Sequence, residues 1–322
     1  MLKQFRKKIF ISLAIAALIG VAFSLYANTS ALKEALSLFD YKMLPIILLF
    51  PILNYLIRFV RWEFYLKALG IDIPRSESFG VFFSSLSMSV TPGKMGEVVK
   101  SYFLKSLNAV PISRSAPIIF AERITDFLAL LIIATFGAYG IGQDKEFIFL
   151  CAFFFLVGLY VIANRSLSLG IINFSKRIPL VSKWIKEIEI AYESSRTILS
   201  GKSLIISTLL GLLAWYSECI GFLFVLGALG IHLKLLSASF IYSFSIIVGA
   251  VSFLPGGIGA TETSLAGLLI LAKIPKSAAV AATLIVRALT LWFAVIIGAG
   301  VLSYMQRHYE IAANDKLEHS GS

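Results

Sequence analysis

Two long stretches of the chain contain no charged residue, and they limit the possible folds more than any other feature. They cover residues 9–27 and 147–163. The whole chain is 58% hydrophobic and only 15% charged, and its mean hydropathy is +0.87. Apolar runs of about 18 residues are typical of membrane-spanning helices, whereas soluble domains are about a quarter charged. The sequence therefore predicts an all-α polytopic membrane protein.

Basic residues precede residues 9–27, as they do in a signal peptide. The apolar run is long for a signal peptide, however, and no clear small-x-small cleavage site closes it. We expect this segment to remain in the protein as its first transmembrane helix.

Hydropathy predicts six full spans and two interrupted regions. Each interrupted region contains two short apolar arms around a Pro-Gly break, which is typical of re-entrant or broken helices. The interrupted regions cover residues 79–107 and 237–273. The full spans are expected at residues 9–27, 43–61, 116–140, 147–163, 204–229 and 278–304.

The distribution of positive residues predicts the orientation. With the N-terminus in the cytoplasm, 21 of the 29 Lys and Arg residues fall in cytoplasmic segments, 6 fall in outer segments, and Arg123 and Arg287 lie within spans. Cytoplasmic loops of membrane proteins are enriched in Lys and Arg. We therefore expect a multi-pass protein of the cell (inner) membrane with both termini in the cytoplasm.

The cytoplasmic segment 164–203 has a helical pattern of its own. Its apolar residues recur at steps of three and four, with Lys and Glu on the other face. Such a helix lies on the inner membrane surface or packs on the bundle, and both alternatives stay open. The apolar residues are Val181, Trp184, Ile185, Ile188 and Tyr192.

Three landmarks recur in the same order in the two halves of the chain: a Gly, a Pro-Gly break and an Arg. They are 22 and 31 residues apart in the first half, and 25 and 32 residues apart in the second. Matching order and spacing indicate an internal duplication. The landmarks are Gly70, Pro92 and Arg123, then Gly230, Pro255 and Arg287.

The number of crossings decides how the two halves are oriented. Between their starts the chain crosses the membrane an odd number of times, whether or not the first interrupted region spans it. The sequence therefore predicts inverted repeats with two re-entrant or broken helical hairpins, an arrangement typical of transporters whose site lies near the midplane. Residues 1–322 form one transmembrane domain: a first helix (9–27), repeat one (43–163), the cytoplasmic amphipathic segment (164–203), repeat two (204–304) and a tail (305–322).

Ionisable residues inside predicted spans are costly and usually face a partner or a pathway. Glu122, Arg123 and Asp126 lie in one span, and the two acids share a helix face because they are four residues apart. The alternative for Arg123 is that its side chain reaches the inner interface and pairs with an acid.

Arg287 lies deep in the last span and requires a counter-charge. Glu262 and Glu218 are the candidates within the chain, and a lipid phosphate is the alternative because it suits the planar guanidinium.

The two Pro-Gly breaks could receive an anion. After the first break a helix resumes near Glu97, and a helix N-terminus presents free N–H groups to which Lys94 and Lys100 add full charge. In the second break the glycines permit close approach of the backbone. Plain tight turns between short helices are the alternative.

Composition gives no sign of a metal or a cofactor. Cys151 and Cys219 lie in apolar segments, and neither they nor the three histidines have a metal-ligand spacing. The net charge of +11 is explained by loop topology, so nucleic acid is not an expected partner.

The segments TPGKMGEVVKSYFL, ERITD and LPGGIGATE resemble, in this order, the signature segments of the lysylphosphatidylglycerol synthase transmembrane-region family. That family includes the flippase half of the multiple peptide resistance factor and stand-alone relatives of the YbhN type. The similarity extends over about residues 9–305.

The resemblance implies lipid handling. The flippase half moves an aminoacylated phospholipid, made by a separate soluble synthase domain, across the membrane. Some relatives are linked to polyprenyl- or dolichyl-linked sugar pathways. The segment after residue 305 is too short for a synthase domain, so lysyl transfer is not expected in this chain.

We therefore expect a membrane lipid transporter or flippase, not an enzyme, that recognises a phosphate-containing headgroup. Phospholipids, aminoacyl-phospholipids and polyprenyl-phosphate lipids all fit. Basic residues would bind phosphate, while carboxylates would balance charge or bind a cationic part of the headgroup. The predicted substrate-binding residues, none of them catalytic, are Lys94, Gly96, Glu97, Lys100, Glu122, Arg123, Asp126, Gly256, Gly257, Gly259, Glu262 and Arg287.

Other functions stay open. Glu122 and Asp126 could supply acid–base chemistry to a membrane-embedded transferase. The chain could also be a scaffold or an accessory protein in a lipid-linked sugar or lipid-modification pathway. Membrane lipids are the expected partners, and a separate lipid-modifying enzyme and a homo-oligomer remain open.

Overall fold

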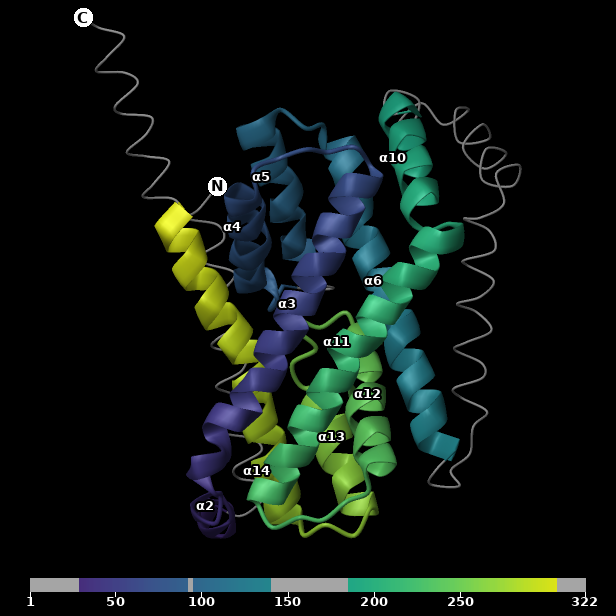
Figure 1. Ribbon diagram of the computed structural model, residues 1–322. Helices are drawn as coiled ribbons and strands as arrows, with labels where there is room; N and C mark the ends of the chain where they lie inside the picture. Colours follow the sequence, from purple (N-terminus) through teal and green to yellow (C-terminus); the bar gives the residue numbers. More distant parts are fainter. Residues whose placement is uncertain (1–28, 92–94, 140–184, 306–322) are drawn as a thin grey trace, which may run out of the picture.

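The computed structural model describes residues 29–91, 95–139 and 185–305. Within these ranges the regular structure is helical and contains no strand, which confirms the all-α fold class. The helices form an elongated bundle (Figure 1). Three of the described helices are long and apolar enough to cross a membrane, namely Tyr41–Ala68, Gly201–Ala228 and Lys276–Met305. The expected spans 9–27 and 147–163 lie outside the described residues.

The elements follow one another in two similar series. The first is α2 (Thr29–Ser37), η1 (Tyr41–Met43), α3 (Leu44–Ala68), α4 (Arg75–Ser85), η2 (Leu86–Met88), η3 (Met95–Val98), α5 (Val99–Asn108) and α6 (Ile112–Tyr139). The second is α10 (Ile185–Ile198), α11 (Gly201–Ala228), α12 (Leu235–Val251), α13 (Ala260–Leu271), α14 (Lys276–Arg287) and η4 (Ala288–Trp292), a π-helical turn. After η4 the helix continues to Met305.

α3 and α11 end in the same turn. Gly70 has a φ of 61° and Gly230 a φ of 71°, a left-handed conformation that favours glycine. In both turns the amide that follows the glycine donates to a carbonyl in the last turn of the helix, at 2.9 Å. The repeated ALG sequence therefore makes equivalent helix ends.

The last long helix of each series also begins in the same way. The carbonyl of Pro111 accepts a hydrogen bond from the first turn of α6, and that of Pro275 accepts one from α14. Arg123 and Arg287 each lie 12 residues after their proline, so the two arginines occupy equivalent helix positions.

The two series run in opposite directions (Figure 1). α3 rises from α2 at the lower end, whereas α11 descends from α10 at the upper end. α4 and α5 fill the upper half, and α12 and α13 fill the lower half. This course agrees with the predicted inversion, while the duplication itself stays a prediction.

The two broken hairpins meet near the middle of the bundle. A Cβ on Gly256 would lie 3.3 Å from the Cα of Val90, so the two breaks are in contact. Val90, Ile258, Leu291 and Val295 form a small apolar cluster at this point. The breaks therefore lie where the two halves join.

The described loops lie at the two ends of the bundle in the grouping that the sequence predicted. The described loops expected in the cytoplasm lie at the upper end of Figure 1, and those expected outside lie at the lower end. Which end faces the cytoplasm stays a prediction.

The count of 21 cytoplasmic cations assigned residues 58–75 to a cytoplasmic loop, and this assignment is wrong in its first part, because α3 continues to Ala68. Arg58 and Arg61 are only 5% and 0% exposed, and Lys100, also assigned to a cytoplasmic segment, is 0% exposed. Acidic residues inside the bundle offset the cost of burying these cations. Without the three, 18 cytoplasmic cations still exceed the 6 outer ones.

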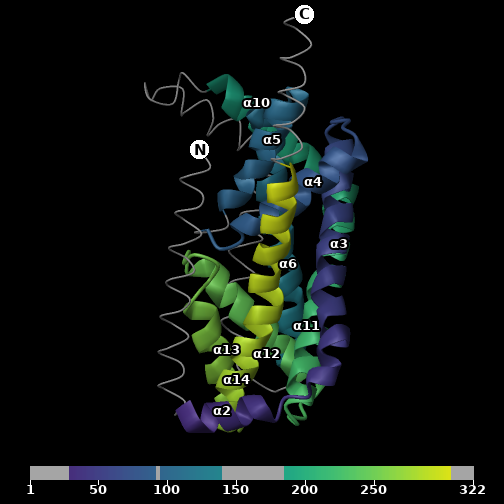
Figure 2. The ribbon, with the colours of Figure 1, turned by 90° about the vertical axis from the view of Figure 1, so that its left-hand side faces the viewer.

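Two short helices flank the bundle. α10 packs against α6, and Ile198 at its end is fully buried, which favours the packed alternative for this part of segment 164–203. α2 lies across the lower end of the bundle, as Figure 2 shows, where Leu32 and Ala35 pack on Val280 and its neighbours.

Candidate functional site

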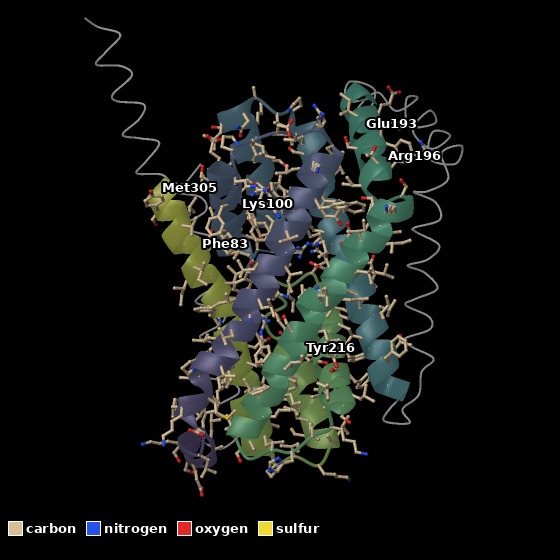
Figure 3. All side chains as sticks on the ribbon, viewed as in Figure 1. Phe83, Lys100, Glu193, Arg196, Tyr216 and Met305 are labelled. Atoms are coloured by element: carbon tan, nitrogen blue, oxygen red, sulfur yellow. The ribbon has the colours of Figure 1, made fainter. Side chains whose placement is uncertain are left out.

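A group of buried charged side chains, which we call the upper charge cluster, lies between α3, α5 and α6. Lys100, one of its members, lies in the upper half of the bundle (Figure 3). Its seven members are Arg58 and Arg61 on α3, Glu97 on η3, Lys100 on α5, and Glu122, Arg123 and Asp126 on α6.

Glu97 is shared by three cations. Its carboxylate lies 3.2 Å from the guanidinium of Arg123 and 3.7 Å from both Arg58 and Lys100. The predicted helix start after the first break therefore presents a carboxylate to the cluster, and Lys100 follows it by one turn.

Lys100 is enclosed by an acid and two aromatic rings. Its Nζ lies 2.5 Å from Glu122 Oε2, 4.8 Å from the centre of the Trp62 ring and 5.2 Å from that of Phe82. A carboxylate together with aromatic faces is a favourable environment for an ammonium group.

Asp126 connects three helices. Its Oδ1 accepts hydrogen bonds from Arg61 Nη2 on α3 at 2.7 Å and from Trp215 Nε1 on α11 at 3.0 Å. Its Oδ2 lies 3.1 Å from Arg123. A Cβ on Gly211 would approach Arg61 Nη1 to 3.0 Å, so the missing side chain gives α11 room to pack beside this pair.

The upper charge cluster contains four cations and three carboxylates, counted over the described residues. Most of these side chains are buried, but the side chain of Arg123 is 25% exposed. Buried charges are costly unless they are paired. A fourth buried carboxylate, Glu218 on α11, also interacts electrostatically with Arg58, so the positive and negative charges around the cluster are balanced. The accessible guanidinium of Arg123 suits an anionic ligand.

A smaller ion pair lies in the second series. Arg287 Nε donates to Glu262 Oε1 at 2.6 Å, and Arg287 Nη2 donates to the carbonyl of Gly256 at 2.7 Å. Glu262 Oε2 accepts the amide of Gly259 at the start of α13, also at 2.6 Å. Glu262 is thus the protein partner of Arg287, while the other candidate, Glu218, accepts the hydroxyl of Tyr242.

Glu97–Arg123 and Glu262–Arg287 are corresponding pairs. Each joins the acid just after a break to the arginine of the following long helix. The Arg123 side chain is 25% exposed and that of Arg287 is 8% exposed, so the first pair is the more accessible of the two.

The glycines predicted for the site allow backbone conformations and close packing that other residues would not. Gly256, Gly257 and Gly259 have φ values of 60°, 67° and 94°, which glycine adopts readily. A Cβ on Gly96 would lie 2.7 Å from both Met88 and Thr91, so this position allows close packing beside the first break.

The predicted residues are thus divided between two places. Glu97, Lys100, Glu122, Arg123 and Asp126 come together in the upper charge cluster. Glu262 and Arg287 form the ion pair of the second series, and Gly256 and Gly259 form hydrogen bonds with it. Lys94 lies outside the described residues. Among the described residues, no group of three or more His, Cys, Asp or Glu side chains could hold a metal ion.

Three members of this network were not predicted: Arg58, Arg61 and Trp215. The two arginines are three residues apart within an aromatic, apolar sequence, so they share one helix face. That spacing and those neighbours were the available signal of burial. Nothing in the sequence indicated that Trp215 would reach Asp126.

Comparison with known proteins agrees with the sequence motifs. Residues 9–298 match the family model described as the lysylphosphatidylglycerol synthase TM region. A UPF0104 membrane protein of Methanocaldococcus jannaschii is 25% identical over 223 residues, covering 68% of this chain and 94% of the relative. One from Methanothermobacter thermautotrophicus is 25% identical over 317 residues, covering 91% of this chain and 92% of the relative. One from Pyrococcus horikoshii is 22% identical, covering 85% of this chain and 90% of the relative.

Proposed function

The chain belongs to the lysylphosphatidylglycerol synthase transmembrane-region family, and we propose that it is a membrane lipid transporter, or flippase, that binds the phosphate of a lipid headgroup. The observation that carries this proposal is the accessible guanidinium of Arg123 in the upper charge cluster, whose other members are buried. Phospholipids, aminoacyl-phospholipids and polyprenyl-phosphate lipids all present a phosphate.

Arg123 is the proposed contact for the phosphate. Its planar guanidinium offers several donors in a fork that matches phosphate oxygens. Glu97 and Asp126 hold it in place at 3.2 and 3.1 Å, and its exposed part remains open to a ligand. A headgroup can therefore bind without first breaking a buried ion pair.

Movement of the lipid would follow from the arrangement of the two halves. Broken hairpins that run in opposite directions and meet near mid-height are suited to alternating access, in which one half rocks against the other around a fixed site. In this scheme the protein lies in the inner membrane and the upper end of the bundle faces the cytoplasm. Arg287 would contact phosphate only in a state in which Glu262 and Gly256 release it.

A membrane-embedded transferase has less support. Glu122 and Asp126 would supply its acid–base chemistry, yet Lys100 holds the first, and Arg61 and Arg123 hold the second. Both carboxylates are nearly or fully buried, so neither is placed to exchange a proton with a substrate.

The proposed phosphate contact is tested in phosphatidylcholine vesicles that contain the purified protein and a trace of fluorescent phosphatidylglycerol. We expect the wild type to move this lipid between leaflets faster than protein-free vesicles do. Arg123→Gln should slow it roughly tenfold, because a hydrogen bond to a charged group contributes about 1.5–3 kcal/mol.

Lys105→Gln is the matched control, since it removes one exposed cation of α5 outside the cluster. Its rate should equal that of the wild type. An unchanged rate for Arg123→Gln would remove the phosphate role of Arg123, and a wild-type rate equal to that of empty vesicles would remove the transport function.

A further inference from the structure

We infer that this site selects lipids whose headgroup is net negative and rejects those whose phosphate is offset by an ammonium group, an inference that rests on the transport function proposed above. The shared chemistry of the accepted lipids is an anionic lipid phosphate. Aminoacylated and ethanolamine headgroups belong to the rejected class.

The first observation is that the carboxylates of the upper charge cluster are already engaged. Glu97 faces three cations, Glu122 binds Lys100, and Asp126 binds Arg61 as well as Arg123. Their side chains are at most 5% exposed. A headgroup that reaches Arg123 therefore meets a guanidinium, and none of the three described carboxylates of the cluster is accessible to an ammonium group.

The second observation is that the chain itself fills the place best suited to an ammonium group. The Nζ of Lys100 lies against Glu122 and faces the rings of Trp62 and Phe82 at 4.8 and 5.2 Å. Such surroundings recognise alkylammonium ligands. Because Lys100 is 0% exposed there, a cationic headgroup cannot enter without displacing it.

The acid at the second break is engaged in the same way. Glu262 uses one oxygen for Arg287 and the other for the amide of Gly259. It is 6% exposed. Neither break of the chain therefore offers the carboxylate that the sequence suggested for a cationic headgroup part.

The charge of Arg123 also favours a headgroup that is net negative. A ligand that brings a negative charge is attracted by the guanidinium of Arg123, which is the exposed charge of the cluster among the described residues. A ligand with an additional ammonium group places a positive charge near Arg123 instead. We expect this repulsion to weaken binding roughly tenfold or more.

The test is native mass spectrometry of the purified, delipidated full chain in detergent, titrated separately with four lipids. These are phosphatidylglycerol, undecaprenyl phosphate, phosphatidylethanolamine and lysyl-phosphatidylglycerol, the three glycerolipids with identical acyl chains. We expect phosphatidylglycerol to bind roughly tenfold more tightly than the two ammonium-bearing lipids. The undecaprenyl arm shows whether a phospholipid or a polyprenyl carrier supplies the anionic phosphate.

Two variants locate the selectivity. Arg123→Gln should remove most of the difference between phosphatidylglycerol and lysyl-phosphatidylglycerol, and Lys105→Gln should retain it. Lys100→Ala, which vacates the aromatic site, should strengthen binding of lysyl-phosphatidylglycerol relative to wild type. If Arg123→Gln fails to fold, Arg123→Lys replaces it and should keep the preference for the anionic lipid.

The outcomes separate the two claims. Equal or tighter binding of lysyl-phosphatidylglycerol by the wild type would overturn the selectivity and leave phosphate-lipid transport standing. Failure of all four lipids to bind would overturn both the selectivity and the phosphate site on which it rests.

Discussion

At the scale of single residues, Asp126 is the point where α3, α6 and α11 are joined. Its carboxylate contacts Arg61, Arg123 and Trp215, which come from these three helices. Arg61 is fully buried, so its charge depends on this partner. The conformation of Arg123, and with it the proposed phosphate contact, therefore depends on residues that a ligand does not touch.

Removing the charge of Asp126 should destabilise the protein strongly. Asp126→Asn leaves Arg61 buried without its counter-charge, and breaking a buried ion pair costs about 3–5 kcal/mol. The midpoint of thermal unfolding in detergent measures the effect. Glu34→Gln on the exposed face of α2 is the control and should leave the midpoint unchanged, whereas equal midpoints for both variants would contradict the role of Asp126.

Trp215→Phe separates the hydrogen bond from the packing of the ring. The variant keeps an aromatic side chain but loses the Nε1 donor to Asp126, so we expect a smaller loss of about 1.5–3 kcal/mol. Tyr216→Phe, at the exposed neighbouring position on α11, should be neutral. A neutral Trp215→Phe would show that the indole hydrogen bond does not support the cluster.

The sequence identified part of this network and missed the rest for a physical reason. Glu122, Arg123 and Asp126 stood out because they interrupt a predicted span. Arg58 and Arg61 lie near the expected end of span 43–61, where a cation is ordinarily exposed, and they are buried because acids from other elements face them. Pairing between helices distant in sequence is not visible in local hydropathy.

At the scale of elements, the last helix is fitted closely against the first broken hairpin. A side chain on Gly298 would overlap the backbone of Ser87, whereas nothing lies within 4 Å of a Cβ on Gly300. The π-helical turn η4 lies earlier in the same helix, and Tyr55 of α3 donates its hydroxyl to the carbonyl of Thr290 within it at 2.8 Å. This helix thus contacts both α3 and the hairpin of the first series.

Gly298→Ala and Gly300→Ala should have effects of opposite sign. The first forces the last helix away from η2, and overpacking of this kind costs about 1–3 kcal/mol. The second replaces an exposed helical glycine and should stabilise the helix by up to about 1 kcal/mol. Thermal unfolding of both variants measures the pair, and a fall in midpoint for Gly300→Ala alone would contradict the packing described here.

The interruptions of the hairpins were predictable, but their contact was not. Pro-Gly pairs and short apolar arms indicated that the chain is interrupted after η2 and after α12. The approach of Gly256 to Val90 joins residues from opposite halves of the chain, and no local pattern marks it. The predicted spans 9–27 and 147–163 lie outside the described residues and stay predictions.

At the scale of the whole molecule, the two series run in opposite directions and carry corresponding Glu–Arg pairs (Figure 1). The order of landmarks and the odd number of crossings led to this expectation. The halves differ in charge, because Lys100, Glu122 and Asp126 have no charged counterparts at the matching positions Leu265, Val286 and Thr290. The upper charge cluster is thus specific to the first series.

The predicted orientation can be tested with single cysteines on opposite ends of the bundle. In a background without Cys151 and Cys219, Lys234→Cys should react with a membrane-impermeant thiol reagent in intact cells. Lys105→Cys should react only after the cells are permeabilised. Both positions are exposed, so burial does not protect either. The reverse pattern would place the upper end of the bundle outside the cell.

The central claim is that the protein moves a lipid by recognising its phosphate. The most direct measurement compares, in the same proteoliposomes, the initial rates of leaflet exchange of fluorescent phosphatidylglycerol and of a fluorescent glucosyl-diacylglycerol with identical acyl chains, each corrected for protein-free vesicles. We predict a protein-dependent rate for phosphatidylglycerol that is roughly tenfold higher than that for the phosphate-free lipid, and loss of this difference in Arg123→Gln. Equal protein-dependent rates for the two lipids would contradict phosphate recognition.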